Sequence, residues 1–569
     1  MKKKDLVNSG FLSLFSFFIL FFFRATEQTG DSLNYLYCAK TGENLFHPHH
    51  LLFNPAVRIF YLLFSYIFKN SDVLLSAQIH NIIWAVITVL SVYFIIDKIS
   101  GSKALSLLAS LSWNFCLGFW FLSTQAETYV AALGCISLII LILAKKYEKI
   151  ITTRQYLSIS CLFILGVLYH QMMILFFIPM TIYFLFCQKR NYLRIFLINA
   201  FVSVIAIVLI YVAAFYFSRK GLEAKSFYYY ATLYWHNPVA CWGKFNHFNL
   251  LTIKQFIFSQ LWNFIAVPLK FKNIFIYIFL VLKVFLIIWH VVSVFKKKPF
   301  YKIRLALIVF LLVHSLFCIW WLPEETEFPL ISAWALLILG FIFLNDISEI
   351  SRRKLNPALF FLISLMVFGL AFRNYTTIIS GMHKNKGKSY DRACQLARLN
   401  KEGCILFEGH PVIYNYKFYF NKKAIVDDFD ALVSFYNFKQ PLINLDGKTC
   451  LFVSLDTLSP RNNFTGANGY LKPKEWLLFI EWLFAVEKDK AGIIRGCREF
   501  QVIVDPLKKD EVFLKLGSKK TAVDGLADML SRLDKMLEPY LKEEYKNIFT
   551  RWLNDLYLKK IKPTSSQAF

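Results

Sequence analysis

Residues 11–53 decide the fold, and they read FLSLFSFFILFFFRATEQTGDSLNYLYCAKTGENLFHPHHLLF. The basic run Lys2–Lys4 precedes one apolar segment, Phe11–Phe23, which has the composition of a membrane helix. No small-residue cleavage site follows, since the next residues are Arg24–Glu27, so we expect an anchored span and not a removed signal peptide. This span delivers a polar loop, with acids and the cluster His47–His50, to the far face of a membrane.

The composition is that of a polytopic membrane protein. Of 569 residues, 57% are hydrophobic and 18% aromatic, and the mean hydropathy is +0.47, far above the balance of soluble domains. A membrane helix needs about 20 apolar residues. We therefore expect an α-helical membrane protein with about eleven spans, near residues 11–23, 73–96, 104–123, 128–144, 156–168, 172–187, 195–217, 273–295, 303–322, 328–345 and 356–379.

The formal charge of +27 does not indicate a nucleic-acid partner, because the basic residues gather in alternate loops. The basic clusters fall at 98–103, 145–154, 189–194, 296–304 and 352–354. Between them lie turns without Lys or Arg, at 124–127, 170–171 and 323–328. Cytoplasmic loops of membrane proteins are the basic ones. We therefore predict a multi-pass protein of the cell (inner or plasma) membrane with a cytoplasmic N-terminus and an extracytoplasmic C-terminal tail.

This topology divides the chain into a transmembrane domain (1–380), with large outer loops at 24–72 and 218–272, and a tail (381–569). The tail alternates strand-like and helical runs, which predicts an extracytoplasmic α/β domain. The strand-like runs are Cys404–Phe407, Lys423–Val426, Cys450–Leu455 and Phe500–Val504, and the helical ones are Glu475–Val486 and Leu526–Leu558. Cys394, Cys404, Cys450 and Cys497 could form disulfides there, although no spacing demands it. The tail has no phosphate loop, nucleophile elbow or metal signature, so we expect it to support or recognise an acceptor.

The stretch from Arg154 to Arg190 has basic loops at both ends and one polar centre, Tyr169-His170-Gln171. About 30 apolar residues are too many for one membrane crossing and too few for two full ones. We therefore expect a hairpin of two short helices with His170 and Gln171 at its tip. An ionisable residue at such depth is functional by default. The alternative is a core histidine that is hydrogen-bonded to a neighbouring helix.

Two further outer turns carry carboxylates. Glu127 stands directly before one span, and the turn Trp320–Phe328 between two others contains Glu324, Glu325 and Glu327. These residues can be an interfacial aromatic belt with solvated charge. However, each of the three short outer turns carries acids, amides or histidines and no Lys or Arg, which favours a shared polar site.

The loop 24–72, called the first loop below, is the richest in candidate catalytic groups. A carboxylate can take the proton of an attacking hydroxyl, and cations or hydrogen-bond donors can stabilise a departing phosphate. Asp31 can supply the first, and Arg24 with the histidines the second. An acid on a loop is more often merely solvated. Two histidines and Asp31 could also bind a divalent cation, but nothing in the spacing fixes a third ligand.

The segments GDSLNYLY, FHPHHLLFNP, HNIIWAVITVLSVYFI, WNFCLGFWFLSTQAETYVAAL and ILGVLYHQMMILFFIP, in this order, resemble the GT-C superfamily. That superfamily includes the protein O-mannosyltransferases and the lipid A aminoarabinose transferase. The resemblance implies an inverting glycosyltransferase that moves a sugar from a polyprenyl-phosphate-linked donor to a lipid, glycan or protein acceptor outside the cytoplasm. Asp31 matches the catalytic acid. Donor or phosphate binding is then expected of Arg24, His47, His49, His50, Glu127, His170 and Gln171, with Glu27, Trp321, Glu324, Glu325 and Glu327 at the cavity rim.

The chain departs from that family in two places. Relatives often carry a glutamate where this chain has Asn34, and they often read His-Pro-Pro where it has His47-Pro48-His49. Two other functions compete with glycosyl transfer. A transporter or flippase of lipid-linked glycans usually has pseudo-symmetric halves, and we find no internal repeat. A non-catalytic cell-envelope scaffold would make Asp31 dispensable.

Overall fold

The computed structural model describes most of the chain, in two compact units. The first unit comprises Met1–His236 and Trp242–Gly387, and the second comprises Asn237–Cys241 and Lys388–Phe569. The described residues are 3–68, 72–147, 149, 151–186, 190–218, 226–232, 249–350, 357–400, 404–408, 410–420, 425–427, 450–454, 487–488, 494–504, 506–507, 512–521 and 535.

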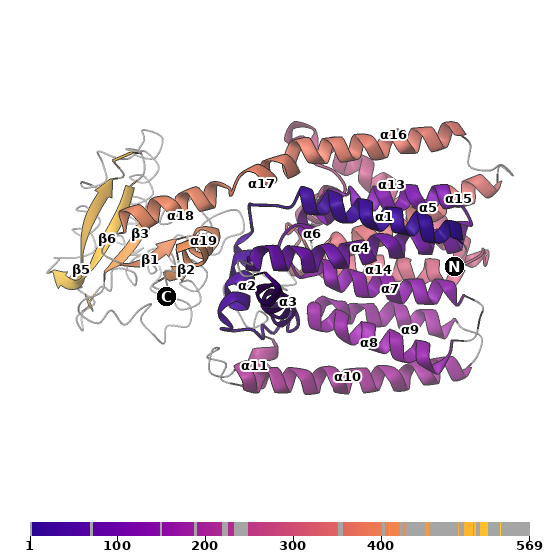
Figure 1. Ribbon diagram of the computed structural model, residues 1–569, viewed down its shortest axis with the longest axis horizontal. Helices are drawn as coiled ribbons and strands as arrows, with labels where there is room; N and C mark the ends of the chain where they lie inside the picture. The colour runs from indigo at the N-terminus through magenta and orange to yellow at the C-terminus, as the bar shows by residue number, and fades with distance from the viewer. Residues whose placement is uncertain are drawn as a thin grey trace, which may run out of the picture. The chain divides into compact units, whose positions relative to one another are not determined.

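The first unit is a bundle of apolar helices (Figure 1). Within the described residues, six helices are long and apolar enough to cross a membrane. They are α4 (Val73–Ser100), α10 (Arg190–Ser218), α13 (Lys272–Phe295), α14 (Tyr301–Trp321), α15 (Leu330–Ile350) and the stretch from Phe360 in α16 (Pro357–Asn374). The pair α5 (Lys103–Asn114) and α6 (Leu117–Ser123), which is bent by 64°, meets the same criterion only when the two helices are counted as one span.

Shorter apolar helices fill the remaining predicted spans. They are α1 (Lys3–Phe22), α7 (Tyr129–Lys145), α8 (Thr153–Tyr169) and the run of η1 (Gln171–Phe176) with α9 (Phe177–Leu185). Every apolar segment predicted from the sequence thus contains a helix, and the multi-pass helical fold is confirmed. The number of crossings, about eleven, stays a prediction because only the longer helices meet the length criterion.

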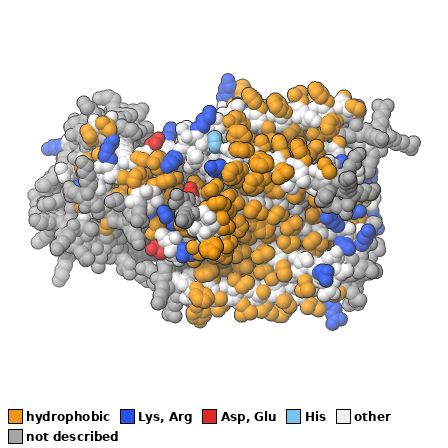
Figure 2. Space-filling model, in the orientation of Figure 1, with side chains coloured by type: hydrophobic (Ala, Val, Ile, Leu, Met, Phe, Trp, Pro, Cys, Tyr) orange, Lys and Arg blue, Asp and Glu red, His pale blue; other side chains and the backbone are white. Residues whose placement is uncertain are grey.

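The surface of the bundle suits a lipid environment. Figure 2 shows hydrophobic side chains covering the middle of one face, with Lys and Arg largely confined to its two ends. Phe201 of α10 is 67% exposed and Phe361 of α16 is 69% exposed. A large continuous apolar surface of this kind is typical of a face that contacts lipid.

The first loop folds as two helices, α2 (Gly30–Thr41) and α3 (Phe53–Ile67), at the end of the bundle opposite the N-terminus (Figure 1). The Thr29 hydroxyl accepts a hydrogen bond from the backbone N–H of Ser32 at 3.0 Å, which caps the start of α2. The helix ends at Gly42, whose φ of +84° favours glycine. Arg58 of α3 donates to a carbonyl in the last turn of α2 at 3.0 Å. This bond joins the end of α2 to α3.

The helices α8 and α9 form the predicted hairpin. The rings of Tyr156 and Phe184 lie 5.5 Å apart and those of Phe163 and Phe177 lie 6.5 Å apart. Both pairs are symmetric about position 170, so the two arms are antiparallel and His170 stands at the turn. The hairpin expected from the basic loops at its ends is confirmed.

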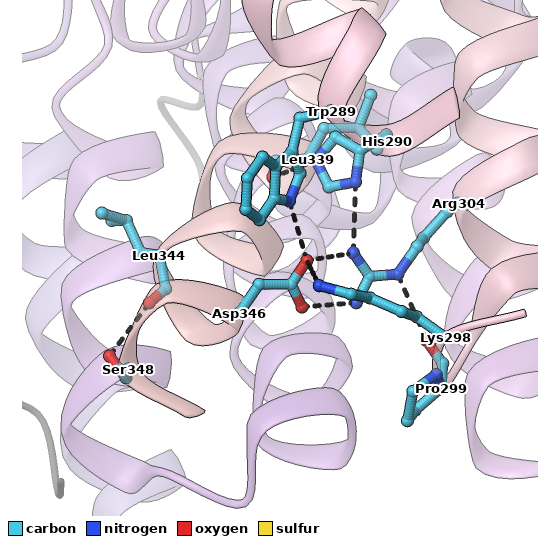
Figure 3. Close-up of polar contacts among 9 residues, drawn as sticks. All are labelled: Trp289, His290, Lys298, Pro299, Arg304, Leu339, Leu344, Asp346 and Ser348. Carbon is cyan, nitrogen blue, oxygen red and sulfur yellow. Dashed lines mark hydrogen bonds and ion pairs between the residues drawn. The ribbon is translucent and has the colours of Figure 1, made fainter. Parts of the chain in front are cut away.

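A buried ion pair joins α13, α14 and α15 (Figure 3). Arg304 donates to both carboxylate oxygens of Asp346 at 2.7 Å, and each side chain is only 2% exposed. Trp289 donates to Asp346 at 2.9 Å, His290 accepts from Arg304 at 3.2 Å, and the Lys298 ammonium lies 3.8 Å from the carboxylate. The bidentate geometry and the added hydrogen bonds are what a charge pair needs to be stable in an apolar interior.

The second unit contains an α/β sheet in the order β2-β1-β3-β6-β5-β4. Strand β1 is parallel to β2 and β3, and the other pairs are antiparallel. The strands are β1 (Ile405–Glu408), β2 (Ile425–Asp427), β3 (Leu451–Ser454), β4 (Glu487–Lys488), β5 (Ile494–Val504) and β6 (Val512–Thr521), with helices α18 (Lys388–Leu399) and α19 (His410–Phe420). Leu396 and Ile413 of these helices pack with Leu406 and Phe452 of the sheet.

The sequence predicted four of these strands. The predicted runs near 404–407, 423–426, 450–455 and 500–504 correspond to β1, β2, β3 and β5. Strand β6 was not predicted, since its second half, Gly517–Thr521, is polar. Cys404 and Cys450, which precede β1 and β3, form a disulfide. The predicted helices Glu475–Val486 and Leu526–Leu558 lie almost wholly outside the described residues, as does much of the predicted outer loop 218–272.

Candidate functional site

A cavity of about 340 Å³ opens in the first unit. Its walls come from α2, from the His-Pro segment of the first loop, from the tip of the α8–α9 hairpin and from the turn between α14 and α15. Among the predicted site residues, Asp31, His49, His50, His170, Gln171, Trp321, Glu325 and Glu327 line it. Residues that are far apart in the sequence therefore meet at one site.

The other predicted site residues are not among the lining residues. Arg24 donates to the carbonyl of Phe21 at 3.0 Å and lies over the ring of that residue. Burial raises the pKa of Glu27, which lies near the end of α1. The remaining ones are His47, Glu127 and Glu324. Their direct contacts with a donor stay predictions.

The backbone of the His-Pro segment is held by three neighbouring elements. The hydroxyl of Tyr211 in α10 donates to the carbonyl of Pro48 at 2.7 Å. The hydroxyl of Tyr230, in α11 (Phe227–Ala231), donates to the carbonyl of Phe46 at 2.8 Å. The backbone N–H of Gln171 donates to the carbonyl of His49 at 3.0 Å. The histidines are therefore presented by a fixed backbone and not by a loose loop.

The histidine rings form a compact group on one side of the cavity. The rings of His47 and His50 stack with centroids 4.3 Å apart, and His50 lies 6.3 Å from His170. His50 is 5% exposed, and neither of its ring nitrogens has a hydrogen-bond partner among the described residues. A buried polar group without a partner is costly. The unpaired nitrogens make His50 a candidate ligand position, and its contact with a donor stays a prediction.

Burial sets the protonation of these rings. It lowers the pKa of His47 to about 4, although the nearby Asp31 carboxylate raises it. Burial and the neighbouring histidines also hold the pKa of His49 and His50 well below the usual range. At neutral pH each ring is therefore an uncharged imidazole with one N–H donor. Neutral N–H donors of this kind can donate hydrogen bonds to an anionic ligand.

Asp31 lies in the first turn of α2, where the backbone N–H groups of the helix favour a negative charge. Its charge raises the pKa of Glu127, and also that of Glu325 and Glu327. In all three cases burial is the larger cause. The cavity thus has a carboxylate wall in which few of the members can be ionised together.

Glu127 supports this wall from behind α2. Its Oε1 accepts hydrogen bonds from the hydroxyls of Thr29 at 2.6 Å and of Ser32 at 2.7 Å. Asn81 of α4 in turn donates to the backbone carbonyls of Gln125 and Glu127 at 2.8 and 2.7 Å. These bonds fix the start of α2, and with it Asp31, against α4.

The acidic turn between α14 and α15 is held in a similar way by α12 (Leu250–Trp262). Ser259 donates to the carbonyls of Pro323 and Glu324 at 3.0 Å each. Asn263 donates to the carbonyl of Thr326 at 2.7 Å. Within the part of the chain that the structure describes, no group of three or more His, Cys, Asp or Glu side chains is arranged to hold a metal ion. Binding of a divalent cation stays a prediction.

The sequence analysis named Gln171, Trp321 and the turn that ends at Phe328, but it did not assign the other aromatic and amide residues to the site. Tyr35, Tyr129 and Phe328 line the cavity, and the ring of Tyr129 lies 4.6 Å from that of His170. Asn81 lies inside an apolar span, and Asn263 closes an amphipathic helix. The visible signal was a polar residue in an apolar segment, but its partners are backbone carbonyls, which no side-chain pattern reveals.

The chain is similar to known proteins in part of its sequence and in its fold. Residues 47–217 match the family described as dolichyl-phosphate-mannose-protein mannosyltransferase. ArnT from Cupriavidus metallidurans bound to undecaprenyl phosphate has a TM-score of 0.55 and 10% identity, over 90% of this chain and 98% of that chain. The apo state of the same protein has a TM-score of 0.52 and 10% identity, over 90% and 97%. No curated protein matches by sequence.

Proposed function

We propose that this chain, which has the fold of the GT-C membrane glycosyltransferases, transfers a sugar from a polyprenyl-phosphate-linked donor to an acceptor outside the cytoplasm. The acceptor is a lipid, a glycan or a protein. The observation that carries the proposal is the cavity itself. Asp31 and the histidines 49, 50 and 170 line one space, so a base and donors for a phosphate meet there.

The reaction follows from these groups. An oxygen of the acceptor hydroxyl attacks the anomeric carbon of the donor sugar while the bond from that carbon to the phosphate oxygen breaks. Asp31 takes the hydroxyl proton as the new bond forms, and the lipid phosphate leaves with the electron pair of the broken bond. Attack from the side opposite the phosphate inverts the anomeric carbon.

The histidines supply what the leaving phosphate needs. Charge grows on the phosphate as the bond breaks, and preorganised donors aimed at that charge lower the barrier. Neutral imidazole N–H groups can donate to the phosphate oxygens, and the developing negative charge raises the affinity of each ring for a proton. ArnT, which shares the fold, binds undecaprenyl phosphate. This supports a lipid phosphate as the donor's leaving group in this chain.

The aromatic wall fits the rest of the donor. Trp320, Trp321 and Phe317 line the cavity beside the carboxylates, and the rings of Phe317 and Trp321 stack 5.7 Å apart. Aromatic faces pack against the apolar faces of sugar rings and against isoprenoid chains. The Cys404–Cys450 disulfide supports an oxidising compartment for the second unit.

The deciding experiment compares envelope lipids, glycans and glycoproteins by mass spectrometry in cells with the parent chain, without it, and with Asp31→Asn. We expect one sugar to be missing from one product class both without the chain and with the variant. If the variant restores the sugar, Asp31 is not the base and a scaffold is favoured. If lipid-linked sugars accumulate inside the cell instead, the chain is a transporter.

A further inference from the structure

Lys283 is a cation in the middle of the membrane helix α13, and it is only 8% exposed. Among the described residues it has no carboxylate partner, and its ammonium lies 4.9 Å from the ring centre of Phe256. A buried ammonium within a membrane span costs several kcal/mol or more unless its surroundings compensate.

A chain of three hydrogen bonds leads from Lys283 to the cavity. Lys283 Nζ donates to Gln260 Oε1 at 2.7 Å. Gln260 Nε2 donates to Ser332 Oγ at 2.9 Å, and Ser332 donates to the backbone carbonyl of Pro329 at 2.9 Å. Pro329 directly follows Phe328, which lines the cavity. Gln260 and Ser332 are fully buried, so no solvent competes for these bonds.

Lys283 fixes the donor and acceptor roles along this series of hydrogen bonds. An ammonium can only donate, so it turns the oxygen of the Gln260 amide toward itself and the NH₂ group toward Ser332. The Ser332 hydroxyl then accepts from Gln260 and is free to donate to Pro329. A neutral residue at position 283 would leave the amide free to rotate, and the bond to Pro329 would lose its constraint.

Helix α12, which carries Gln260, also holds the other end of the turn 323–329. Ser259, next to Gln260, donates to the carbonyls of Pro323 and Glu324, and Asn263, the C-cap of α12, donates to the carbonyl of Thr326. On the face that also meets Lys283, α12 packs through Phe256 and Ile257 against Cys318 and Ile319 of α14. The position of α12 therefore determines the course of the whole turn 323–329.

We propose that Lys283 is a positioning residue: acting through Gln260 and Ser332, it fixes the turn 323–329 that carries Glu325 and Glu327 into the cavity. It touches no reacting atom. It keeps two carboxylates at a set distance from Asp31, and an active site needs such supporting groups to hold its geometry. The inference builds on the proposed glycosyl transfer, but its structural part can be tested without any activity.

The test is hydrogen–deuterium exchange of the full chain in lipid nanodiscs, read by mass spectrometry on peptides covering 323–331. In the parent, Glu325 and Thr326 donate their backbone N–H groups within the turn. We expect Lys283→Met to speed exchange there about tenfold, the effect of one lost hydrogen bond, and to leave peptides of α2 unchanged. The matched control Lys272→Met makes the same change on the same helix, where the ammonium lies over Phe258 and not on Gln260.

Ser332→Ala provides a second variant in case Lys283→Met does not fold, because it removes only the hydroxyl that ends the hydrogen-bond series from Lys283 to Pro329. It should speed exchange in the same peptides. Combining it with Lys283→Met should add little, since both substitutions interrupt the same series of hydrogen bonds. Unchanged exchange at 323–331 in Lys283→Met, or in Ser332→Ala where the first variant does not fold, overturns the positioning role.

The activity of the same proteins separates the two proposals. If the exchange results hold and the parent transfers sugar, we expect kcat/KM to fall in Lys283→Met and to be unchanged in Lys272→Met. If the exchange results hold but the parent transfers no sugar, the glycosyltransferase proposal fails while the positioning of the turn stands. If exchange rises but kcat/KM does not fall, the turn is held by Lys283 without consequence for the site, and the inference is wrong.

Discussion

The hydroxyl of Thr29 donates to Glu127 Oε1 at 2.6 Å, which joins the residue that caps α2 to the turn between α6 and α7. The second oxygen of Glu127 is buried and has no hydrogen-bond partner among the described residues. A proton on that oxygen would relieve the cost of a buried charge. Glu127 is therefore suited to remain a neutral acid behind Asp31.

This relationship predicts how stability depends on pH. Burial, and then the charge of Asp31, raise the pKa of Glu127 to about 8. In the unfolded chain a glutamate titrates near its ordinary value of about 4.3. The folded protein thus binds the proton more tightly, and the stability from this group is present at low pH and is lost as pH rises toward 8. Glu127→Gln keeps an acceptor for Thr29 and Ser32 and removes the titration.

We therefore expect the thermal midpoint of the parent in detergent to fall between pH 5 and pH 8, and that of Glu127→Gln to fall less. Each pKa unit of difference between the folded and unfolded states corresponds to about 1.4 kcal/mol. Midpoints measured at pH 5, 6.5 and 8 check this. Equal slopes for the two proteins would show that Glu127 does not hold the proton.

Asp31→Asn should lower the rate of sugar transfer by about 10²- to 10⁴-fold, because the amide keeps the size of the side chain but cannot accept the acceptor's proton. Asp72→Asn is the matched control. Asp72 caps α4 by accepting from the backbone N–H of Leu74 at 3.0 Å, and asparagine can do the same. Single-turnover rates of both variants test the role. A parental rate in folded Asp31→Asn would make Glu27 the next candidate.

His170→Ala should weaken the binding of undecaprenyl phosphate by roughly 10- to 100-fold, the effect of one lost hydrogen bond to a charged group. His170 stands at the hairpin tip, lines the cavity and accepts from the N–H of Met172 at 3.3 Å. Binding to protein in nanodiscs, measured beside the thermal midpoint, separates donor contact from folding. Parental affinity with a lowered midpoint would make His170 a core residue.

Asp346→Asn should lower the thermal midpoint strongly, because removing one partner leaves the buried Arg304 without its counter-ion, at a cost of about 3–5 kcal/mol. Asp97→Asn is the control, since Asp97 pairs with Lys103 at 2.6 Å but the two side chains are 22% and 40% exposed. An exposed pair contributes only about 0.2–1 kcal/mol. Similar midpoints for the two variants would show that the ion pair in Figure 3 is dispensable.

Topology can be tested directly. We expect reporter fusions at positions 150 and 298 to be cytoplasmic and one at position 450 to be outside, in line with the basic loops. The Cys404–Cys450 disulfide offers an independent measurement, since it should form in cells and shift gel mobility on reduction. A cytoplasmic signal at 450 together with reduced thiols would invert the orientation and the site assignment with it.

The sequence predicted the helices well because a membrane demands long apolar segments, and it predicted the hairpin from the charges at its ends. It could not predict α3, whose exposed face includes Leu62 and Leu63 while Phe53 and Val57 are buried. Such an amphipathic helix is too short and too mixed to stand out in hydropathy. The resemblance to the GT-C superfamily is confirmed at the level of the fold.

The site was predicted less completely, for a physical reason. Acids and histidines can be recognised in a sequence as candidate catalytic residues, and Asp31, His50 and Glu325 do line one cavity. The residues that hold them in place cannot be recognised in this way. Lys283 and Gln260 are 23 positions apart in the sequence, and their hydrogen bond becomes visible only in the structure, where α12 and α13 lie side by side. Hydrogen bonds between residues far apart in the sequence produce no periodic pattern from which they could be predicted.

Asn81 and Asn263 hold their turns by the backbone carbonyls of Glu127 and Thr326, which every residue type possesses. The side chains at positions 127 and 325 can therefore be exchanged without removing these bonds. Substitutions at position 325, which lines the cavity, can alter the charge and shape offered to a new sugar while the protein still folds. Close relatives with different substrates should thus differ at the tip of the turn 323–329 and agree in Asn263 beneath it.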